Sequence, residues 1–476
     1  MSNVNPWFLG AFVVYMVTVL AIGLWAYRRT KNVMDFWVFG QNMGPVLATW
    51  SLIANFVSSV SVIGFVGAVY VEGYAIMGHT VMGLMLGLTA LYFVVGRVRP
   101  LNVLTFPDLM ARVSGQQVSR PLAGSILLLS GWLYLIMQLV GASLLVSAIT
   151  GVPYTVLVWV IGAVFIIYTV LGGLVSVAWT DLLQGILMVS AVIITLIYMT
   201  IDMGGITSFN ERLTALNASF VDPLAGGKYT LVGVSATFLA FFGTILTEQD
   251  MLIRIAATRD VRTAKIHVAA AGVVLSIFYS MLILLGGATT VALVSAGLSI
   301  DNPDAAFPTL ITSYVPTGIG VVIILAVMSA ILSTTDTRLH ATGMTWARDI
   351  YSYFRPQADE ERLMRVSRTA TVVLGLSATA AAVDPPGTII TLYGFRAVLL
   401  TSAFFVPVYA AIFWAKLEGR AVLTAVIAGG ATGLVAHVLG GGSGAIPSTF
   451  YGVGTATATL LIVHALFGLR TRPAAS

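Results

Sequence analysis

Three residues inside a long apolar stretch have the types and spacing to hold a small cation. Ala330, Ser333 and Thr334 stand at positions i, i+3 and i+4, so a helix would turn two hydroxyls and a backbone carbonyl to the same side. Such neutral oxygens suit a monovalent ion such as sodium, because a divalent ion normally recruits Asp or Glu. The alternative remains open that the hydroxyls bond back to their own helix or link neighbouring helices.

The composition requires that helix to lie in a membrane. Hydrophobic residues make up 58% of the chain and charged residues only 9%, whereas a soluble domain carries about 25% charged residues. The length of 476 residues accommodates roughly thirteen spans of about 20 residues each. We therefore expect an all-α, polytopic membrane protein whose residues 1–476 form a single transmembrane domain. The absence of cysteine excludes disulfides, thiolate metal sites and cysteine nucleophiles.

Apolar runs bounded by turn residues predict the individual helices. The first run is followed by three basic residues and has no small-residue cleavage site, so it predicts a retained helix and not a signal peptide. The expected ranges are 6–27, 44–71, 76–98, 119–149, 154–177, 179–201, 230–254, 264–296, 315–351, 364–383, 386–414, 420–440 and 447–469.

The basic residues orient these helices. With the N-terminus outside, alternating crossings place all but three of the 24 Lys and Arg residues in cytoplasmic segments. The exceptions are Arg212 and Lys228 on the outside and Arg396 within a span. The expected location is the plasma (inner) membrane of a bacterium, with the C-terminus in the cytoplasm. The net charge of +5 reflects this topology and does not indicate a nucleic-acid partner.

Two of the predicted helices carry polar interruptions that indicate broken helices. In the range 44–71, serines and an asparagine fall where the bilayer centre should be, and Gly64 and Gly67 follow closely, allowing the backbone to unwind. Unwound backbone at this depth offers free carbonyls and is tolerated only against protein or a watery cavity. In the range 230–254, polar residues around Glu248 interrupt the run. An inverted repeat of five plus five helices requires such a pair, although Glu248 could instead mark a helix end near the cytoplasm.

At three places the sequence resembles the sodium:solute symporter family. Ile166–Met188 is similar to the family signature around its paired glycines, and Ala330–Tyr351 resembles the helix that carries the family's sodium site. Ile253–Lys265 resembles a Gln-Arg-x-x-Ala-x-Lys loop, although Ile253 replaces the usual Gln and Arg259 the usual Lys. The motifs occur in the family's order, and the resemblance covers essentially the whole chain.

The resemblance implies a fold related to the leucine transporter. Its core would be an inverted repeat of five plus five helices in residues 44–414, with a discontinuous helix opening each half. Residues 6–43 would form a leading helix and a cytoplasmic loop, and residues 415–476 two further helices and a tail. The implied activity is sodium-coupled symport by alternating access. The implied partners are a small organic solute, sodium and the lipid bilayer, with no obligatory protein partner.

The resemblance also implies the ligands of the coupling sodium ion. They are the backbone carbonyls of Ala54, Val57 and Ala330 and the hydroxyls of Ser333 and Thr334. Asp181 corresponds to an acidic residue beside the family's sodium release route. It could also cap the N-terminus of a helix after a short turn, and the two roles are compatible.

Substrate contacts in the family lie at the two broken helices, at the start of the third helix and on the eleventh. The candidates here are Ser58, Ser61, His79, Thr80, Glu248, Gln249 and Arg396. His79 could instead be a packing residue or bond between helices. A charge such as Arg396 within a span costs several kcal/mol unless it is paired. It could pair with a carboxylate such as Glu248, lie near its helix end, or receive an anionic substrate.

Residues 354–390 resemble the pantothenate branch of the family, but Arg396 stands where that branch carries an acid. We expect a small organic monocarboxylate, with pantothenate as one example, followed by amino acids such as proline and then by sugars. An enzyme is not expected, because the five His residues are scattered without metal-ligand spacing. A transporter-like membrane sensor and a passive channel are the remaining alternatives.

Overall fold

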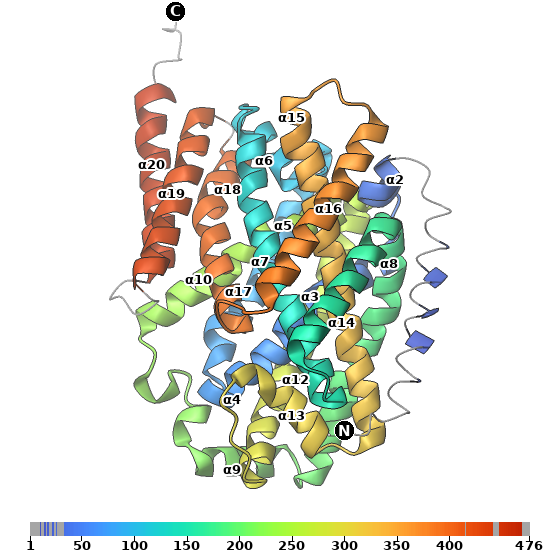
Figure 1. Ribbon diagram of the computed structural model, residues 1–476. Helices are drawn as coiled ribbons and strands as arrows, with labels where there is room; N and C mark the ends of the chain where they lie inside the picture. Colours follow the sequence, from blue (N-terminus) through green and yellow to red (C-terminus); the bar gives the residue numbers. More distant parts are fainter. Residues whose placement is uncertain are drawn as a thin grey trace, which may run out of the picture.

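The fold is described from a computed structural model of the chain. The structure describes residues 10, 14–15, 17–18, 21–22, 25, 33–414, 416–440 and 447–468. Within these ranges the chain forms helices and loops, joined by one isolated β-bridge between Met43 and Thr258. Figure 1 shows the helices gathered into one bundle. The expectation of an all-α protein is confirmed.

The helices follow one another with short connections. Their bounds are α2 Val33–Val38, α3 Pro45–Phe56, α4 Phe65–Glu72, α5 Met82–Val98, α6 Phe106–Ser114, α7 Ser119–Thr150, α8 Tyr154–Asp202, α9 Ile206–Leu216, α10 Leu231–Thr247, α11 Gln249–Ala257, α12 Val261–Ser295, α13 Ala306–Ser313, α14 Thr317–Met344, α15 Ser352–Phe354, α16 Glu360–Ala382, α17 Ile389–Leu400, α18 Val406–Phe413, α19 Gly419–Gly440 and α20 Ser448–Val463. Short π-helical turns used below are η2 Val60–Gly64, η3 Met77–Val81 and η8 Thr345–Tyr351, and η7 Pro303–Ala305 is a 3₁₀ turn.

The observed helices agree with the predicted spans. Among the described residues, nine helices are long and apolar enough to cross a membrane, and the bent pair α3–α4 makes ten. The predicted range 154–177 falls within the longer helix α8, and the range 364–383 corresponds to α16, which carries charged residues. The leading helix predicted at 6–27, and most of the segment 6–43, lie outside the described residues.

The helix α8 contains two of the predicted spans. Its 49 residues would extend about 74 Å if straight, well beyond the roughly 40–45 Å of a bilayer. At one end the Tyr154 hydroxyl donates to the carbonyl of Ala382, and at the other Tyr314 donates to Asp202. Tyr314, which contacts the last residue of α8, directly follows α13. Ala382, which contacts the first residue of α8, is followed by a segment in which the Ile389 amide bonds to η7, the turn just before α13. Both ends of α8 therefore lie near α13. The helix therefore turns back, and the predicted ranges 154–177 and 179–201 are its two limbs.

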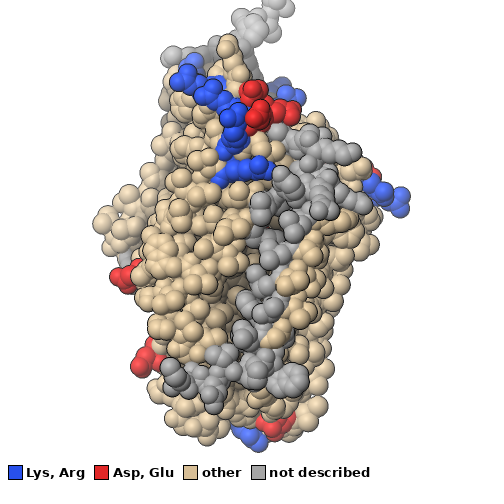
Figure 2. Space-filling view, turned by 45° about the vertical axis from the view of Figure 1, so that its right-hand side comes forward, with Lys and Arg blue, Asp and Glu red and all other residues tan. Residues whose placement is uncertain are grey.

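Basic residues gather at one end of the bundle. Figure 2 shows several Lys and Arg side chains near one end of the molecule and few near the other. Arg212 and Lys228 belong to α9 and the loop after it, at the opposite end from α6 and α15 (Figure 1). Arg254 and Arg338, which the sequence prediction counted among the cytoplasmic segments, have side chains that are buried inside the bundle.

Both predicted helix breaks are present. α3 ends at Phe56, Val57 is extended with φ −82° and ψ 116°, and the axis bends by 48° before α4. Between α10 and α11, Glu248 is likewise extended, with φ −70° and ψ 124°, and the helix resumes at once. Glu248 is only 4% exposed. The alternative that it marks a helix end near the cytoplasm is therefore wrong.

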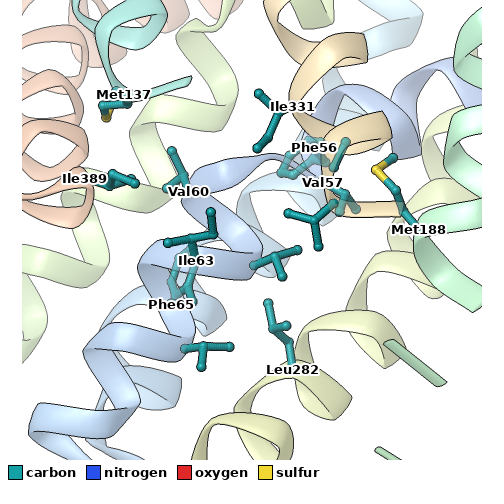
Figure 3. Close-up of a cluster of buried hydrophobic side chains, with 14 of the residues drawn as sticks. Phe56, Val57, Val60, Ile63, Phe65, Met137, Met188, Leu282, Ile331 and Ile389 are labelled. Atoms are coloured by element: carbon teal, nitrogen blue, oxygen red, sulfur yellow. The ribbon is translucent and has the colours of Figure 1, made fainter. Parts of the chain in front are cut away.

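The glycines predicted to unwind the first helix have another role. Gly64 is helical, with φ −65°, and lies within a turn that follows the break. A Cβ on Gly67 would lie 2.4 Å from the carbonyl oxygen of Pro303. These glycines therefore permit close packing, and the chain unwinds before them at Val57. Figure 3 shows the apolar side chains around the break, among them Val57 and Ile331.

Candidate functional site

Four backbone and side-chain oxygens converge where the first break meets α14. The Thr334 hydroxyl oxygen lies 3.4 Å from the carbonyl of Ala54, 3.1 Å from that of Val57 and 2.9 Å from that of Ala330. All four residues are fully buried. A hydroxyl has one proton and can donate to only one of these acceptors at a time. Three carbonyl oxygens thus lie within 3.4 Å of one hydroxyl oxygen, and such a group of neutral oxygens suits a small cation.

The local sequence explains this convergence. The break at Val57 interrupts the hydrogen bonding of α3, so its last carbonyls are free to face another helix. The spacing of Ala330 and Thr334 at i and i+4 turns both oxygens of α14 toward them. Four of the five predicted sodium ligands are thus brought together. The fifth, Ser333, donates its hydroxyl hydrogen to the carboxylate of Asp181.

Asp181 is held in a buried network of side chains. Its carboxylate also accepts from the Ser51 hydroxyl at 2.5 Å and from Nη2 of Arg254 at 3.0 Å. Arg254 in turn donates to the backbone carbonyl of Ser51 at 3.0 Å. Asp181 lies in α8, near the start of the limb that follows the turn. The network links the first broken helix, α8, α11 and α14 directly beside Ser333.

A small cavity lies between the two broken helices. Its volume is about 20 Å³, enough for roughly one water molecule. Phe56, Phe65 and several other apolar side chains supply part of its wall. The polar lining consists of Asn55, Ser58, Ser61, Tyr134, Glu248, Tyr279, Arg338 and Tyr393. A solute larger than water therefore requires these side chains to move apart.

Hydrogen bonds from α7 and α12 hold the unwound backbone beside this cavity. Tyr134 donates to the Ser58 hydroxyl at 3.0 Å. Ser61 donates to the carbonyl of Phe56 at 2.9 Å and lies 2.7 Å from the hydroxyl of Tyr279. The predicted solute contacts Ser58 and Ser61 thus line the cavity, and the two tyrosines beside them were not identified from the sequence.

Glu248 is the centre of a cluster of buried charges. Arg338 places Nη1 2.6 Å from the Glu248 carboxylate, and Arg396 places Nη2 2.5 Å from it. The Nε of Arg338 lies 2.9 Å from Asp250, an ion pair without the alignment of a good hydrogen bond. Both guanidinium groups lie over the Tyr134 ring, at 4.4 and 4.9 Å from its centroid. Two acids and two arginines balance one another in this cluster.

Only part of the cluster reaches the cavity. Glu248 and Arg338 line it, whereas Arg396 lies behind Glu248, is fully buried and donates from Nε to the carbonyl of Ser130 at 3.2 Å. Three alternatives were open for Arg396: an ion pair with an acid, a place near its helix end, or contact with an anionic solute. In the structure Arg396 forms the ion pair with Glu248. Arg338 was not identified from the sequence, although it too is a charge within a predicted span and therefore also requires a partner. Arg338 stands four residues after Thr334 and therefore on the same face of α14.

Three predicted solute contacts lie elsewhere. His79 and Thr80 belong to η3, where Nδ1 of His79 lies 2.8 Å from the Thr80 hydroxyl and its ring is 4.9 Å from that of Tyr229. Gln249 turns away from the cavity and donates to the hydroxyl of Thr345. None of the three is among the described residues that line the cavity.

The end of the molecule that contains α9 and α13 is closed over the first broken helix. The turn η7 packs against α4 at Gly67, and the Asp304 carboxylate of η7 accepts from the backbone amide of Ile389 at 2.9 Å. Burial raises the pKa of the Asp304 carboxyl, and the Ile389 hydrogen bond opposes that rise. η7 therefore joins the start of α17 to α4, the second half of the first broken helix.

Comparisons with known proteins agree with this arrangement. The high-affinity proline transporter PutP of Bacillus subtilis is 26% identical over 88% of this chain and 89% of its own length. A sodium/pantothenate symporter of Haemophilus influenzae is 27% identical over 88% of this chain and 87% of its own. A solved structure of a sodium-coupled sialic acid symporter superposes with a TM-score of 0.78 at 20% identity and covers 98% of both chains.

These likenesses fix the fold and the family. The superposition and the two broken helices confirm the fold related to the leucine transporter. The model of the sodium:solute symporter family matches residues 36–429. The expectation of a transporter and not an enzyme is thereby confirmed. The nearly equal identities to proline and pantothenate transporters leave the solute undecided between them. The chain belongs to the sodium:solute symporter family.

Proposed function

We propose that the protein imports a small zwitterionic solute, with proline as the leading example, together with sodium. The observation that carries the solute class is the pair of opposite charges on the cavity wall, Glu248 and Arg338. A zwitterion presents an ammonium for the carboxylate and a carboxylate for the guanidinium, so its binding leaves the site neutral. An anion alone would bring a net charge into a buried cluster that is already balanced, which is costly at this depth.

Sodium coupling is supported by the oxygens around Thr334. Carbonyl and hydroxyl ligands from the broken α3 and from α14 provide a site without formal charge. The break that frees these carbonyls is continuous with the wall of the solute cavity at Phe56 and Ser58. Filling the cation site would fix the same backbone that the solute contacts, and this shared element is the physical basis for coupling.

A small monocarboxylate such as pantothenate is the second candidate. It is favoured by Arg338, whose guanidinium reaches the cavity, and by the similarity to a sodium/pantothenate symporter. A sodium ion near Thr334 would add a positive charge that partly compensates an anionic solute. This candidate requires Glu248 to keep both of its arginine partners while the solute binds.

Uptake by protein reconstituted in liposomes, with and without a sodium gradient, would separate the candidates. Proline, cyclopentanecarboxylate and pyrrolidine form a matched series, because the second lacks the ammonium and the third lacks the carboxylate. We expect sodium-driven proline uptake, and at least about tenfold weaker competition by either analogue, since each strands one charged partner. Equal competition by cyclopentanecarboxylate, or preferential uptake of pantothenate, would favour the monocarboxylate instead.

Asp181 is proposed to serve sodium release, because it touches the ligand Ser333 without belonging to the group of oxygens around Thr334. Asp181→Asn should slow turnover and change the equilibrium affinity for sodium less than Thr334→Ala does. Sodium-dependent protein fluorescence and initial uptake rates measure the two quantities. A collapse of sodium affinity in a protein that still unfolds cooperatively would place Asp181 among the direct ligands.

We further infer a bacterial inner-membrane location, with the end that contains α6 and α15 in the cytoplasm. The support is the excess of basic residues at that end. Labelling of single cysteines introduced at Ser208 in α9 and at Gln357 before α16 would test the orientation, since the chain has no cysteine of its own. An impermeant reagent applied to intact cells should reach only the first position.

A further inference from the structure

A groove unrelated to the solute cavity runs between η8 and α16. It has a volume of about 720 Å³ and is lined at one end by Arg362 and Arg365 and at the other by Val373 and Leu374. Trp346 of η8 forms part of its wall. Trp346 and Val373 are 42% and 59% exposed, so apolar surface remains open along the groove.

A second hollow adjoins the basic end of this groove. Its volume is about 440 Å³, and it is formed by the loop from Phe354 to Asp359 together with Arg362. Arg355 contributes a further positive charge to its lining. Because Arg362 lines both spaces, the polar hollow and the apolar groove are continuous.

The positive charges at this end are available to a ligand. The Arg362 guanidinium lies 5.9 Å from the Tyr351 ring centroid, a contact that leaves its donors free to turn outward. Arg365 pairs with Glu361 at 3.2 Å, but both side chains are more than 70% exposed and such a pair is weak. The Asp359 carboxylate accepts from the backbone amide of Arg362 and thereby caps α16.

The dimensions match one leaflet of a bilayer. Arg362 and Leu374 are separated by 12 residues of α16, which is about 18 Å along a helix. The hydrocarbon of one leaflet is about 15 Å thick. The start of α16 and α15 lie at the same end of the molecule as α6 (Figure 1). A groove that begins with arginines at this end and ends among valine and leucine therefore has the length and the polar-to-apolar order of one leaflet.

We propose that this groove binds one anionic phospholipid, with its phosphate at Arg362 and Arg365 and an acyl chain against Trp346 and Val373. The charges complement an anionic headgroup, and the apolar part complements a chain that a free phosphate lacks. A soluble protein partner is disfavoured, because the groove has the length and the polar-to-apolar order of a single phospholipid. The proposal is independent of the solute and of sodium coupling.

Trp346 provides a direct probe of occupancy. The protein is placed in liposomes that contain phosphatidylglycerol or phosphatidylcholine with brominated chains, which quench nearby tryptophans. The contribution of Trp346 is the difference between the wild-type protein and Trp346→Phe. We expect brominated phosphatidylglycerol to quench the Trp346 component half-maximally at a mole fraction roughly tenfold lower than brominated phosphatidylcholine requires.

The preference should disappear in the double variant Arg362→Gln with Arg365→Gln. It should persist in Arg262→Gln, which removes an exposed arginine from the start of α12. Equal quenching of Trp346 by the two lipids, or a preference that survives the double variant, would overturn the proposal. Loss of the preference on adding millimolar inorganic phosphate would also overturn it, since that result assigns the arginines to a free anion.

Discussion

Replacing Arg396 by alanine should destabilise the folded protein by about 3–5 kcal/mol. The guanidinium is fully buried and lies 2.5 Å from Glu248, so its removal leaves one acid of the cluster with a single arginine partner. Thermal and denaturant unfolding of the purified protein measures this loss. Arg262→Ala, at an exposed position of α12, is the control for loss of an arginine in general and should change stability little.

The double variant Arg396→Ala with Glu248→Ala should recover part of that loss. Recovery will be incomplete, because Glu248 also pairs with Arg338 and its removal leaves that arginine with Asp250 alone. Arg396→Lys should lie between the wild-type protein and Arg396→Ala, since a point charge replaces a planar fork. A stable Arg396→Ala protein that transports its solute with normal affinity contradicts both the structural pairing and a role in binding.

The helices and their order could be predicted because they depend on local sequence. Long apolar runs fix the spans, and polar residues at mid-span indicate a break. The position of the break was less predictable, since Gly64 and Gly67 invited unwinding and the chain instead unwinds at Val57. The contact between Gly67 and Pro303 joins residues far apart in sequence, which no local pattern contains.

Some residues of the candidate site could be predicted from the sequence and others could not. Ala330 and Thr334 share a face because of helix geometry, and the resemblance to a known family brought in Ala54 and Val57. His79 was carried over by its position in the family, but it lies in the π-helical turn η3. Such a turn adds a residue and rotates the following face, so spacing along an ideal helix does not predict its direction.

For Arg338, the sequence could predict that partners exist but not which residues they are. Its charge within a span was visible in the sequence, yet its partners Glu248 and Asp250 come from the second broken helix. Because a buried charge requires partners of opposite charge, an arginine within a span predicts that acidic residues lie beside it. Only the packing of α14 against α11 identifies which acids they are.

Removing the Thr334 hydroxyl should raise the half-maximal sodium concentration for uptake roughly tenfold to a hundredfold. The hydroxyl oxygen is one of about five ligands, and losing one costs about 1–3 kcal/mol of binding. It lies within 3.4 Å of the carbonyls of Ala54, Val57 and Ala330, so it is the side-chain oxygen at the centre of this group. Ser333→Ala should have an effect of the same kind, because its hydroxyl stands beside this group and bonds to Asp181.

Thr335→Ala is the matched control for both changes. Its hydroxyl is equally buried in α14, one position further along, and donates to the carbonyl of Ile331 in its own helix. Thr334→Ala and Thr335→Ala each lose a hydrogen bond to the carbonyl four residues earlier in α14, so their stabilities should be similar. Ser333→Ala instead loses its bond to Asp181. Only Ser333→Ala and Thr334→Ala should shift the sodium dependence of proline uptake in proteoliposomes. If all three variants keep the wild-type half-maximal sodium concentration, the oxygens around Thr334 only join α3 to α14, and the coupling ion binds elsewhere.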